Sequence, residues 1–360
     1  MSLGGKPRLD ATNDRSQAPV FVLGSPRSGT TLLYDMLLSA GGFAVYLAES
    51  NVFNLLAPRF GNLHSSANRE RLLEAWLGSK LFRASGLEAE QVRQRILRDC
   101  RDPGDFLRIV MEEICIVQGV PRWAENSPEA MLYLPIIKQL IPNALIVHII
   151  RDGRDVATSL GQLRYIRPFP WEKLYSLIGC GLYWEWVLQH GRKFGLSAGE
   201  DYTEVHFEEL LARPQETLDR IGRFVGQSLD YETIQRVAYG SVSRPNTSFR
   251  MQDPKAAFNP VGRWKKSFSP EELALFERLV GKTLQELGYS LATDGPRHPE
   301  DLHLKATRLL HRSYFAGKFW YKNNGWLRTL RPVLKGSDID EIVLADDHPA
   351  LRREPSVQSS

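Results

Sequence analysis

The chain has 360 residues, of which 46 are basic and 42 acidic, so its formal net charge is +4. Hydrophobic residues make up 42% and charged residues 24%, which excludes a wholly disordered, collagen-like or coiled-coil protein. This small positive excess is too weak for a protein that coats nucleic acid, so we expect no nucleic-acid partner and at most a local anion site.

Three scattered cysteines, Cys100, Cys115 and Cys180, have no metal-ligand spacing. An odd, scattered set excludes a disulfide scaffold and fits a reducing, cytoplasmic location. No stretch reaches about 18 uninterrupted apolar residues, so we expect no membrane span. Residues 1–18 are polar, lack the apolar run of a secretory signal and are expected to be flexible.

The first predicted unit is a strand, a glycine-bounded loop and a helix. Residues 20–23 (VFVL) are typical of a buried strand, and helical spacing begins at Thr30, after the loop 24–29. The glycine spacing matches the phosphate loop G-x-x-x-x-G-K-[ST], but Thr30 replaces the lysine. Backbone N–H groups and a helix N-terminus attract an anion there, and Arg27 restores a cation. The missing lysine argues against kinase or ATPase chemistry.

Further strands and helices alternate along the chain. Residues 55–120 have helical spacing and predict a helical insertion. Ser127 precedes Pro128 as a candidate helix cap, and Ser269 with Glu272 forms a capping box. Three further strands are predicted, at 123–125, 144–150 and 203–207. The alternation predicts an α/β fold with a doubly wound parallel sheet, whose ligands lie at the carboxyl ends of the strands.

A second charged turn follows the strand 144–150. Arg151 closes that strand, and Ser159 lies eight residues later, inside the next helix. A strand-end arginine and a helix-face serine can converge on one phosphate, and Arg154 at the helix N-terminus would add positive potential. The alternative is a surface turn of Arg–Asp pairs.

The two segments together resemble the sulfotransferase family, of the carbohydrate and tyrosyl-protein type. Residues 25–32 (SPRSGTTL) resemble its loop for the 5′-phosphosulfate of 3′-phosphoadenosine 5′-phosphosulfate (PAPS), and residues 150–159 resemble its 3′-phosphate motif. The resemblance covers residues 19–290 and implies a P-loop, nucleotide-kinase-like three-layer sandwich that needs no metal. It implies nucleotide-binding roles for Ser25, Pro26, Arg27, Ser28, Gly29, Thr30, Thr31, Arg151 and Ser159.

Two later segments extend the resemblance. Residues 259–265 are similar to a family segment that closes over the adenosine end, which adds Gly262, Arg263, Trp264 and Lys265 to the nucleotide contacts. An ordinary loop before Ser269 is the alternative. Phe207 stands where the family commonly has tyrosine, so any hydrogen bond from that hydroxyl is lost.

Glu49 is the candidate general base, since the family resemblance places a glutamate just beyond the helix that follows the loop. Sulfuryl transfer needs a group that takes the proton of the acceptor hydroxyl, and Arg27 would assist the reaction. The alternatives are a surface role for Glu49 and a base at His148, which is more easily read as a core residue. Asn126 replaces a lysine of the family. Either Arg27 and the backbone compensate, or Arg122 or Lys138 does, or this member is slow or altered. Glu125 could contact the acceptor.

Residues 291–360 form a basic and aromatic extension. Residues 295–335 hold nine basic, two acidic and six aromatic residues. Such a segment either contacts a membrane surface through 305–335 or packs its aromatic rings on the protein, which we favour. The acidic stretch 338–347 could pair with it, and 352–360 are expected to be disordered.

We therefore expect a PAPS-dependent sulfotransferase that acts on a hydroxyl of a carbohydrate, lipid, tyrosine or small metabolite. Residues 50–120 would shape the acceptor pocket. The rival hypotheses are a P-loop kinase-like phosphotransferase and a non-catalytic nucleotide-binding module.

Overall fold

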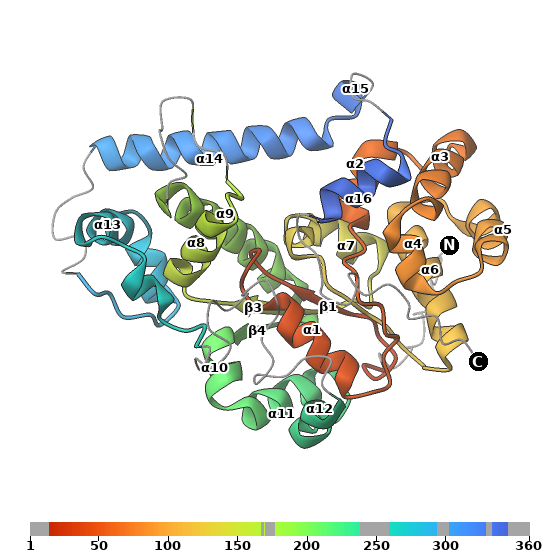
Figure 1. Ribbon diagram of the computed structural model, residues 1–360, viewed down its shortest axis with the longest axis horizontal. Coiled ribbons are helices and arrows are strands. Elements are labelled where there is room, and N and C mark those ends of the chain that lie inside the picture. Colours follow the sequence, from red (N-terminus) through yellow and green to blue (C-terminus); the bar gives the residue numbers. More distant parts are fainter. Residues whose placement is uncertain are drawn as a thin grey trace, which may run out of the picture.

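A sheet of four parallel strands organises the fold (Figure 1). In spatial order the strands are β2 (Ala124–Glu125), β1 (Val20–Leu23), β3 (Leu145–Ile150) and β4 (Tyr202–His206). The predicted parallel sheet is therefore confirmed, and each strand lies within one residue of its expected position. β1 is apolar throughout and β3 is apolar except for His148, because both faces of these strands are buried.

The computed structural model describes residues 14–166, 169, 177–237, 259–293, 302–328 and 333–344. Of residues 1–18, predicted to be flexible, 1–13 lie outside this part, as do the predicted disordered residues 352–360. Residues 14–18 lie inside it, and Ala18 is buried.

Alternate side chains of the strands enter two cores, one on each face of the sheet. Val20 and Val22 join the core formed with α1 (Thr30–Ser39), α10 (Phe207–Ala212), α11 (Pro214–Val225) and α12 (Tyr231–Val237). Phe21 and Leu23 join the larger core on the other face, with η2 (Pro128–Tyr133), α7 (Leu134–Leu140), α8 (Gly153–Gln162), α9 (Leu177–Gly195) and α13 (Pro270–Glu286). The result is the expected three-layer arrangement.

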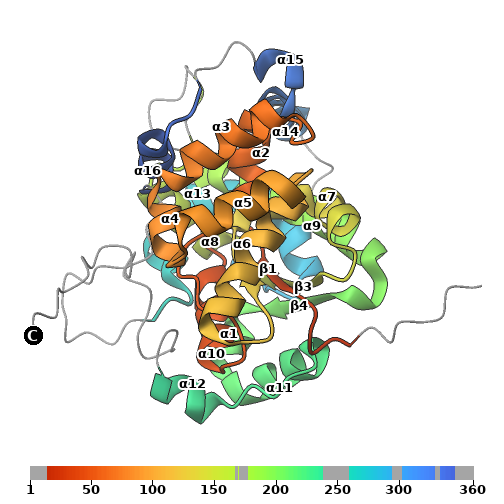
Figure 2. The same ribbon diagram turned by 90° about the vertical axis from the view of Figure 1, so that its right-hand side faces the viewer.

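The helix-rich region predicted at residues 55–120 is observed as a group on the right of Figure 1, which faces the viewer in Figure 2. It contains η1 (Val52–Leu56), α2 (Ala57–Phe60), α3 (Ser66–Leu77), α4 (Lys80–Ser85), α5 (Ala89–Asp99) and α6 (Pro103–Gln118). Asp102 caps α6 by accepting the backbone N–H of Asp105.

The predicted capping box is confirmed, because Ser269 and Glu272 exchange hydrogen bonds at the start of α13. The prediction for Ser127 is wrong in detail. Its side chain makes no cap, and Pro128 opens a 3-10 helix, η2. The Ser127 hydroxyl donates to the carboxylate of Glu125 instead. Two other 3-10 helices are η3 (Leu196–Asp201) and η4 (Arg263–Lys266).

The C-terminal extension contributes α14 (Leu302–Asn323), α15 (Gly325–Arg328) and α16 (Gly336–Leu344). α14 packs along α9 through Leu304, His311 and Phe315. The acidic stretch was predicted to pair with the basic segment. Asp340 does not do so, because its carboxylate accepts from the backbone N–H of Lys80 and from Arg83 on α4. Within the described residues, no helix combines the length and the apolar character that a bilayer crossing demands.

Candidate functional site

The loop after β1 runs directly into the N-terminus of α1. Gly29 takes a left-handed φ of 98° there, and a Cβ on it would lie 2.3 Å from the ring of Phe207. Glycine is therefore required for the loop to pack on the start of α10. Phe207 keeps the packing role of the aromatic position without a hydroxyl. The N–H groups of the first turn of α1 are left for a ligand at the sheet edge.

Three buried polar atoms around this loop have no hydrogen-bond partner in the described part of the chain. They are Ser25 Oγ, Ser28 Oγ and Arg151 Nε. An unpaired buried polar atom costs about 1–3 kcal/mol, so a cluster of them is the mark of a site built for a polar ligand. All are hydrogen-bond donors, which fits an anion.

Arg27 and Arg151, predicted to serve opposite ends of one ligand, lie in a single cluster. Arg27 Nε donates to Ser159 Oγ at 3.0 Å, and Arg151 Nη1 donates to the carbonyl of Arg27 at 3.0 Å. Arg151 is buried, with its guanidinium 4.6 Å from the centre of the Phe207 ring and hydrogen-bonded to Pro260 O. The strands β1 and β3 are neighbours in the sheet, so the two predicted motifs meet at their carboxyl ends.

Positive charges converge on this cluster. Burial lowers the pKa of Arg151, and the nearby charges of Arg27 and Arg263 lower it further, against the opposite effect of Asp155 and Glu208. The two carboxylates act on Arg151 more strongly than the two guanidinium groups do. The unpaired buried donors are therefore what marks the cluster as an anion site.

The segment 259–265 is tied to the first turn of α8 by Asp155. Its carboxylate accepts from the backbone N–H of Gly262 at 2.7 Å and of Trp264 at 2.9 Å. Arg263 reaches Gln162 on the same helix, at 3.2 Å, whereas Lys265 is exposed with its ammonium 5.8 Å from the centre of the Trp264 ring. The late segment lies beside Arg151, which donates to Pro260 O, and its closing over the adenosine end stays a prediction.

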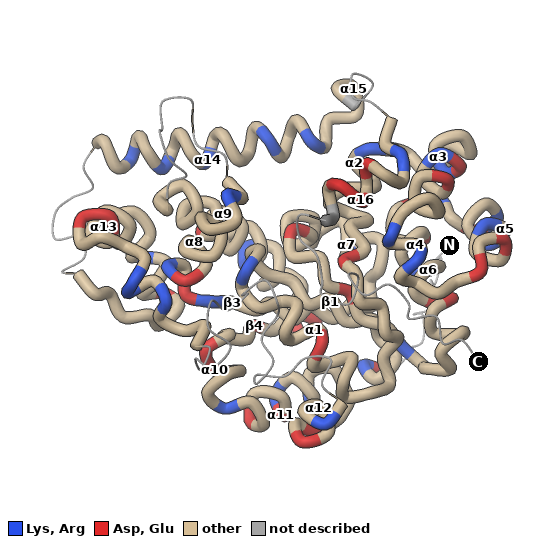
Figure 3. Tube along the Cα trace, in the orientation of Figure 1, with Lys and Arg blue, Asp and Glu red and all other residues tan. Residues whose placement is uncertain are grey.

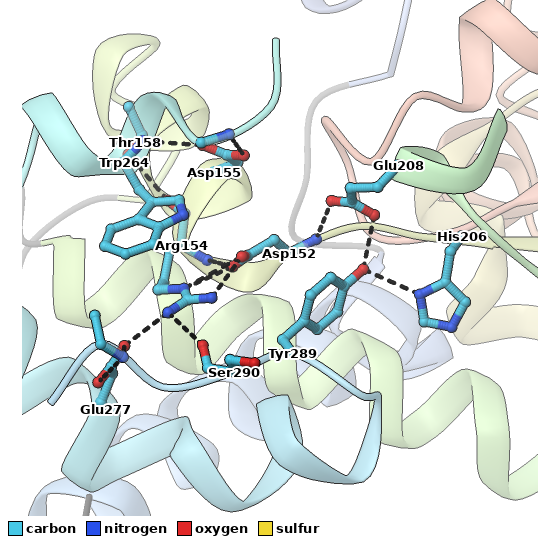
Figure 4. A network of polar contacts seen from close by, with 12 residues as sticks. Asp152, Arg154, Asp155, Thr158, His206, Glu208, Trp264, Glu277, Tyr289 and Ser290 are labelled. Atoms are coloured by element: carbon cyan, nitrogen blue, oxygen red, sulfur yellow. Dashed lines mark hydrogen bonds and ion pairs between the residues drawn. The ribbon is translucent and has the colours of Figure 1, made fainter. Parts of the chain in front are cut away.

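Arg154 does not add potential to the anion site, and that prediction is wrong. Its guanidinium is buried, pairs with Asp152 and Glu277, and stacks 4.1 Å from the centre of the Trp264 ring (Figure 4). Two carboxylates neutralise it, so it serves as an internal brace between α8 and α13.

A second brace in Figure 4 holds the turn after β3. Glu208 accepts the backbone N–H of Asp152 and the hydroxyl of Tyr289. Burial is the main cause of the raised pKa of Glu208. The sequence did not indicate the roles of Asp155 and Glu208, because their partners are distant in the chain. The only available signal was their place next to predicted strand ends.

Glu49 precedes a segment that is clamped to the end of β2. The Ser50 hydroxyl donates to Glu125 Oε1 at 2.7 Å, and Ser127 Oγ accepts the backbone N–H of Asn51 at 3.2 Å. Asn51 has a left-handed φ of 53°, which asparagine tolerates better than most residues. The carboxylate of Glu125 is buried, and its Oε2 has no partner among the described residues, so its suggested contact with the acceptor stays a prediction. This carboxylate positions the backbone next to Glu49, which is half-buried.

Two of the three suggested substitutes for the family lysine, Arg122 and Lys138, lie away from the site. Arg122 is buried and donates to Ala18 O and Val225 O, before β1 begins. Lys138 pairs with Asp201 and donates to Ala144 O, just before β3. Both lie at the amino ends of the strands, so neither reaches the carboxyl edge. Asn126 itself is buried, with Oδ1 unpaired among the described residues.

His148 is a core residue. It is fully buried inside β3, and its Nδ1 lies 2.6 Å from the hydroxyl of Tyr202. Burial lowers the pKa of His148 to about 4, so the ring is neutral near pH 7. The interpretation of His148 as a core residue therefore holds, and Glu49 as the base stays a prediction.

A cavity of about 480 Å³ lies where η2, α9 and α14 meet. Aromatic rings from α9 and α14 line it, with the carboxylate of Glu129 among them. Glu129 accepts from the hydroxyls of Tyr165 and Tyr183 and pairs with Lys322. The volume of the cavity is in the range of small-molecule binding sites. Arg59 is its one lining residue from the region 50–120 that was expected to shape the acceptor pocket.

The fold and the site define a parallel α/β protein with a phosphate-type loop and an arginine-rich anion cluster. Residues 19–231 match the model of the sulfotransferase family, and the chain belongs to that family. Protein-tyrosine sulfotransferase A of Caenorhabditis elegans is 26% identical over 328 residues, which are 88% of this chain and 78% of that protein. Sulfotransferase 1A1 of Bos taurus is 25% identical over 221 residues, 52% of this chain and 74% of that one.

Two solved structures share the fold. The sulfotransferase domain of the olefin synthase of Synechococcus PCC 7002 has a TM-score of 0.52 at 20% identity and covers 76% of this chain and 95% of its own. The sulfotransferase domain from the curacin biosynthetic pathway has a TM-score of 0.50 at 16% identity, and the match covers 76% of this chain and 98% of that domain. The predicted family and fold are confirmed, and the chain is a sulfotransferase.

The Glu125 clamp has a measurable signature. Burial raises the pKa of Glu125 from 4.5 to about 7. The folded protein therefore binds this proton more tightly than the unfolded chain. The resulting stabilisation is fully present below pH 4.5 and is lost as the pH rises through about 7. Glu125→Gln removes this pH dependence. Between pH 4.5 and about 7, the free energy of unfolding of the variant should therefore rise by roughly 3 kcal/mol relative to that of the wild type.

Urea unfolding of both proteins at a series of pH values measures this difference. His148 changes the stability with pH in the opposite direction, because burial lowers its pKa. Both proteins contain His148, so this contribution cancels in the difference between them. A difference in the free energy of unfolding that stays constant with pH would contradict the clamp.

Proposed function

We propose that the chain transfers the sulfuryl group of PAPS to an acceptor hydroxyl. The observation that carries the proposal is the single cluster of Arg27, Ser159 and Arg151 beside the loop, with three unpaired buried donors around it. The loop residues 25–31 and Arg27 would bind the 5′-phosphosulfate. Arg151 and Ser159 would bind the 3′-phosphate, with residues 262–265 closing beside them.

Transfer is in line in this proposal. The acceptor oxygen bonds to sulfur while the bond from sulfur to the 5′-phosphate oxygen breaks, and Glu49 takes the hydroxyl proton. Arg27 and the N–H groups of α1 stabilise the charge on the leaving phosphate and the moving group. Since Asn126 is neutral, that stabilisation falls on Arg27 and the backbone.

The acceptor is a hydroxyl compound, with a carbohydrate, lipid, tyrosine or small metabolite as candidates. Relatives are named for protein tyrosine, which supports including tyrosine peptides. A panel of these classes, assayed with labelled donor, identifies the acceptor. Transfer to none of them, with nucleotide still bound, would favour the non-catalytic module.

The nucleotide assignment is tested by titration with 3′,5′-adenosine bisphosphate without metal, read as a thermal shift. We expect binding, and a clear preference for this ligand over adenosine 5′-monophosphate. Ser159→Ala should reduce that preference ~10–100-fold, because a hydrogen bond to a charged group is worth about 1.5–3 kcal/mol.

The matched control is Thr158→Ala. Thr158 is the neighbouring buried hydroxyl on α8, and it donates to the carbonyl of Arg154 within the same helix. The control should keep the wild-type preference. Binding that requires Mg²⁺ and ignores the 3′-phosphate would instead support the kinase-like alternative.

A further inference from the structure

The outward side of α14 carries an exposed apolar stripe. The members of this outer stripe are spaced alternately four and three residues apart, which places them on one face of a helix. They are Leu302, Ala306, Leu309, Ser313, Ala316 and Trp320. Leu302 is 82% exposed, Leu309 66% and Trp320 61%. The opposite face of α14 is the one that packs on α9.

Basic residues border the outer stripe. Residues 302–328 contain six lysines and arginines and no acidic residue, and Figure 3 accordingly shows blue but no red along α14. Arg308 and Lys322 turn inward to pair with Glu185 and Glu129. The exposed flank beside the stripe carries Lys305 and Arg312, whereas Lys318 lies over the Tyr314 ring at the cavity.

The charge pattern selects the kind of partner. A stripe with four–three spacing also suits a second copy of the helix, but paired helices need opposite charges beside the seam. Here two copies would bring lysine and arginine together, because α14 has no acidic residue. The partner that complements both apolar stripe and basic border is an anionic one.

The shape of the region favours a flat partner. α14 forms an outer edge of the molecule in both views, and α15 continues that edge (Figures 1 and 2). Trp326 on α15 is 76% exposed and Tyr321 is 50% exposed. Tryptophan and tyrosine suit the boundary between lipid and water, and lysine and arginine extend from an apolar surface toward anionic headgroups.

We propose that the outer stripe of α14, together with Trp326, binds the surface of anionic lipid bilayers peripherally. The helix lies in the plane of the interface, with Leu302, Leu309 and Trp320 entering it. The basic border supplies the attraction to lipid phosphate and carboxylate groups. This surface is separate from the nucleotide site, and the inference does not depend on the proposed reaction.

Co-sedimentation of the full chain with vesicles tests the proposal. One set of vesicles is phosphatidylcholine alone, and the other is phosphatidylcholine mixed with phosphatidylserine. We expect binding to the mixed vesicles, weaker binding as salt is added, and little binding to phosphatidylcholine alone. Indole fluorescence should shift to shorter wavelength on binding.

Two variants separate the contributions. Leu309→Ser with Trp320→Ser should lower vesicle affinity at least ~10-fold through lost apolar burial. Lys305→Glu with Arg312→Glu should lower it by a similar factor and remove the salt dependence. Ile116→Ser is the control for the apolar variant, because Ile116 is an apolar side chain that is 65% exposed and lies outside the stripe. Arg101→Glu, on an exposed loop, is the control for the charge variant. Both controls should bind as the wild type does.

Three outcomes would overturn the proposal. They are no binding to the mixed vesicles, equal binding to both kinds of vesicle, or equal loss in the controls. If the wild type is a dimer in the absence of vesicles and Trp320→Ser is a monomer, the outer stripe binds a second copy of the chain instead. Thermal stability and affinity for 3′,5′-adenosine bisphosphate should be unchanged in the stripe variants, which rules out unfolding as the cause of lost binding.

Discussion

Glu49→Gln is expected to lower turnover by ~10²–10⁴-fold while leaving nucleotide affinity unchanged, because an amide cannot take the proton of the acceptor hydroxyl. The substitution keeps the size of the side chain. The neighbouring Ser50 and Asn51 remain clamped to Glu125 and Ser127. The fall should therefore appear in kcat, and the dissociation constant of 3′,5′-adenosine bisphosphate should hold.

Single-turnover transfer with labelled donor measures this effect. Glu112→Gln is a matched control, since Glu112 is a partly buried glutamate of α6, paired with Arg95 and Arg108, outside the site. It should transfer at the wild-type rate. If Glu49→Gln also transfers at that rate, another group is the base. If both variants lose activity and stability together, the effect is structural.

Arg27→Ala is expected to reduce transfer by ~10²-fold or more. Each hydrogen bond from a charged group is worth about 1.5–3 kcal/mol, and a guanidinium can make several to a phosphosulfate. Arg27→Lys should recover only part of the rate, because an ammonium lacks the planar fork.

The backbone of Arg27 provides an internal control for folding. Its φ of 72° lies in the left-handed region, which glycine adopts without strain. Arg27→Gly should therefore unfold at the same or a higher urea concentration than Arg27→Ala, yet transfer no faster. If Arg27→Gly regains wild-type turnover, the guanidinium is not part of the reaction.

The sheet and its loop could be predicted because each is encoded in a short stretch. Residues 20–23 are apolar throughout, residues 144–150 are apolar except for His148, and glycines bound the loop between residues 24 and 29. Parallel strands bring their carboxyl ends to one edge, so the meeting of Arg27 with Arg151 followed from topology alone.

Contacts between distant residues could not be predicted. The pairing of Arg154 with Glu277 joins positions 123 residues apart, and no local pattern distinguishes it from a free arginine at a helix start. The clamp of Ser50 on Glu125 spans 75 residues. Ser127, which also belongs to this clamp, stands before Pro128 and was therefore predicted to be a helix cap. A short motif gives residue types and spacing, whereas the partner that satisfies a buried charge is set by packing.

The hydrogen bond from Arg27 to Ser159 uses only the acceptor side of the serine hydroxyl. The O–H of the same serine can therefore donate to a phosphate while the oxygen still accepts from the guanidinium. In the proposed reaction, a phosphate on Ser159 would thus be linked through one hydroxyl to the side chain that handles the sulfuryl group. A nucleotide without that phosphate would not form this link.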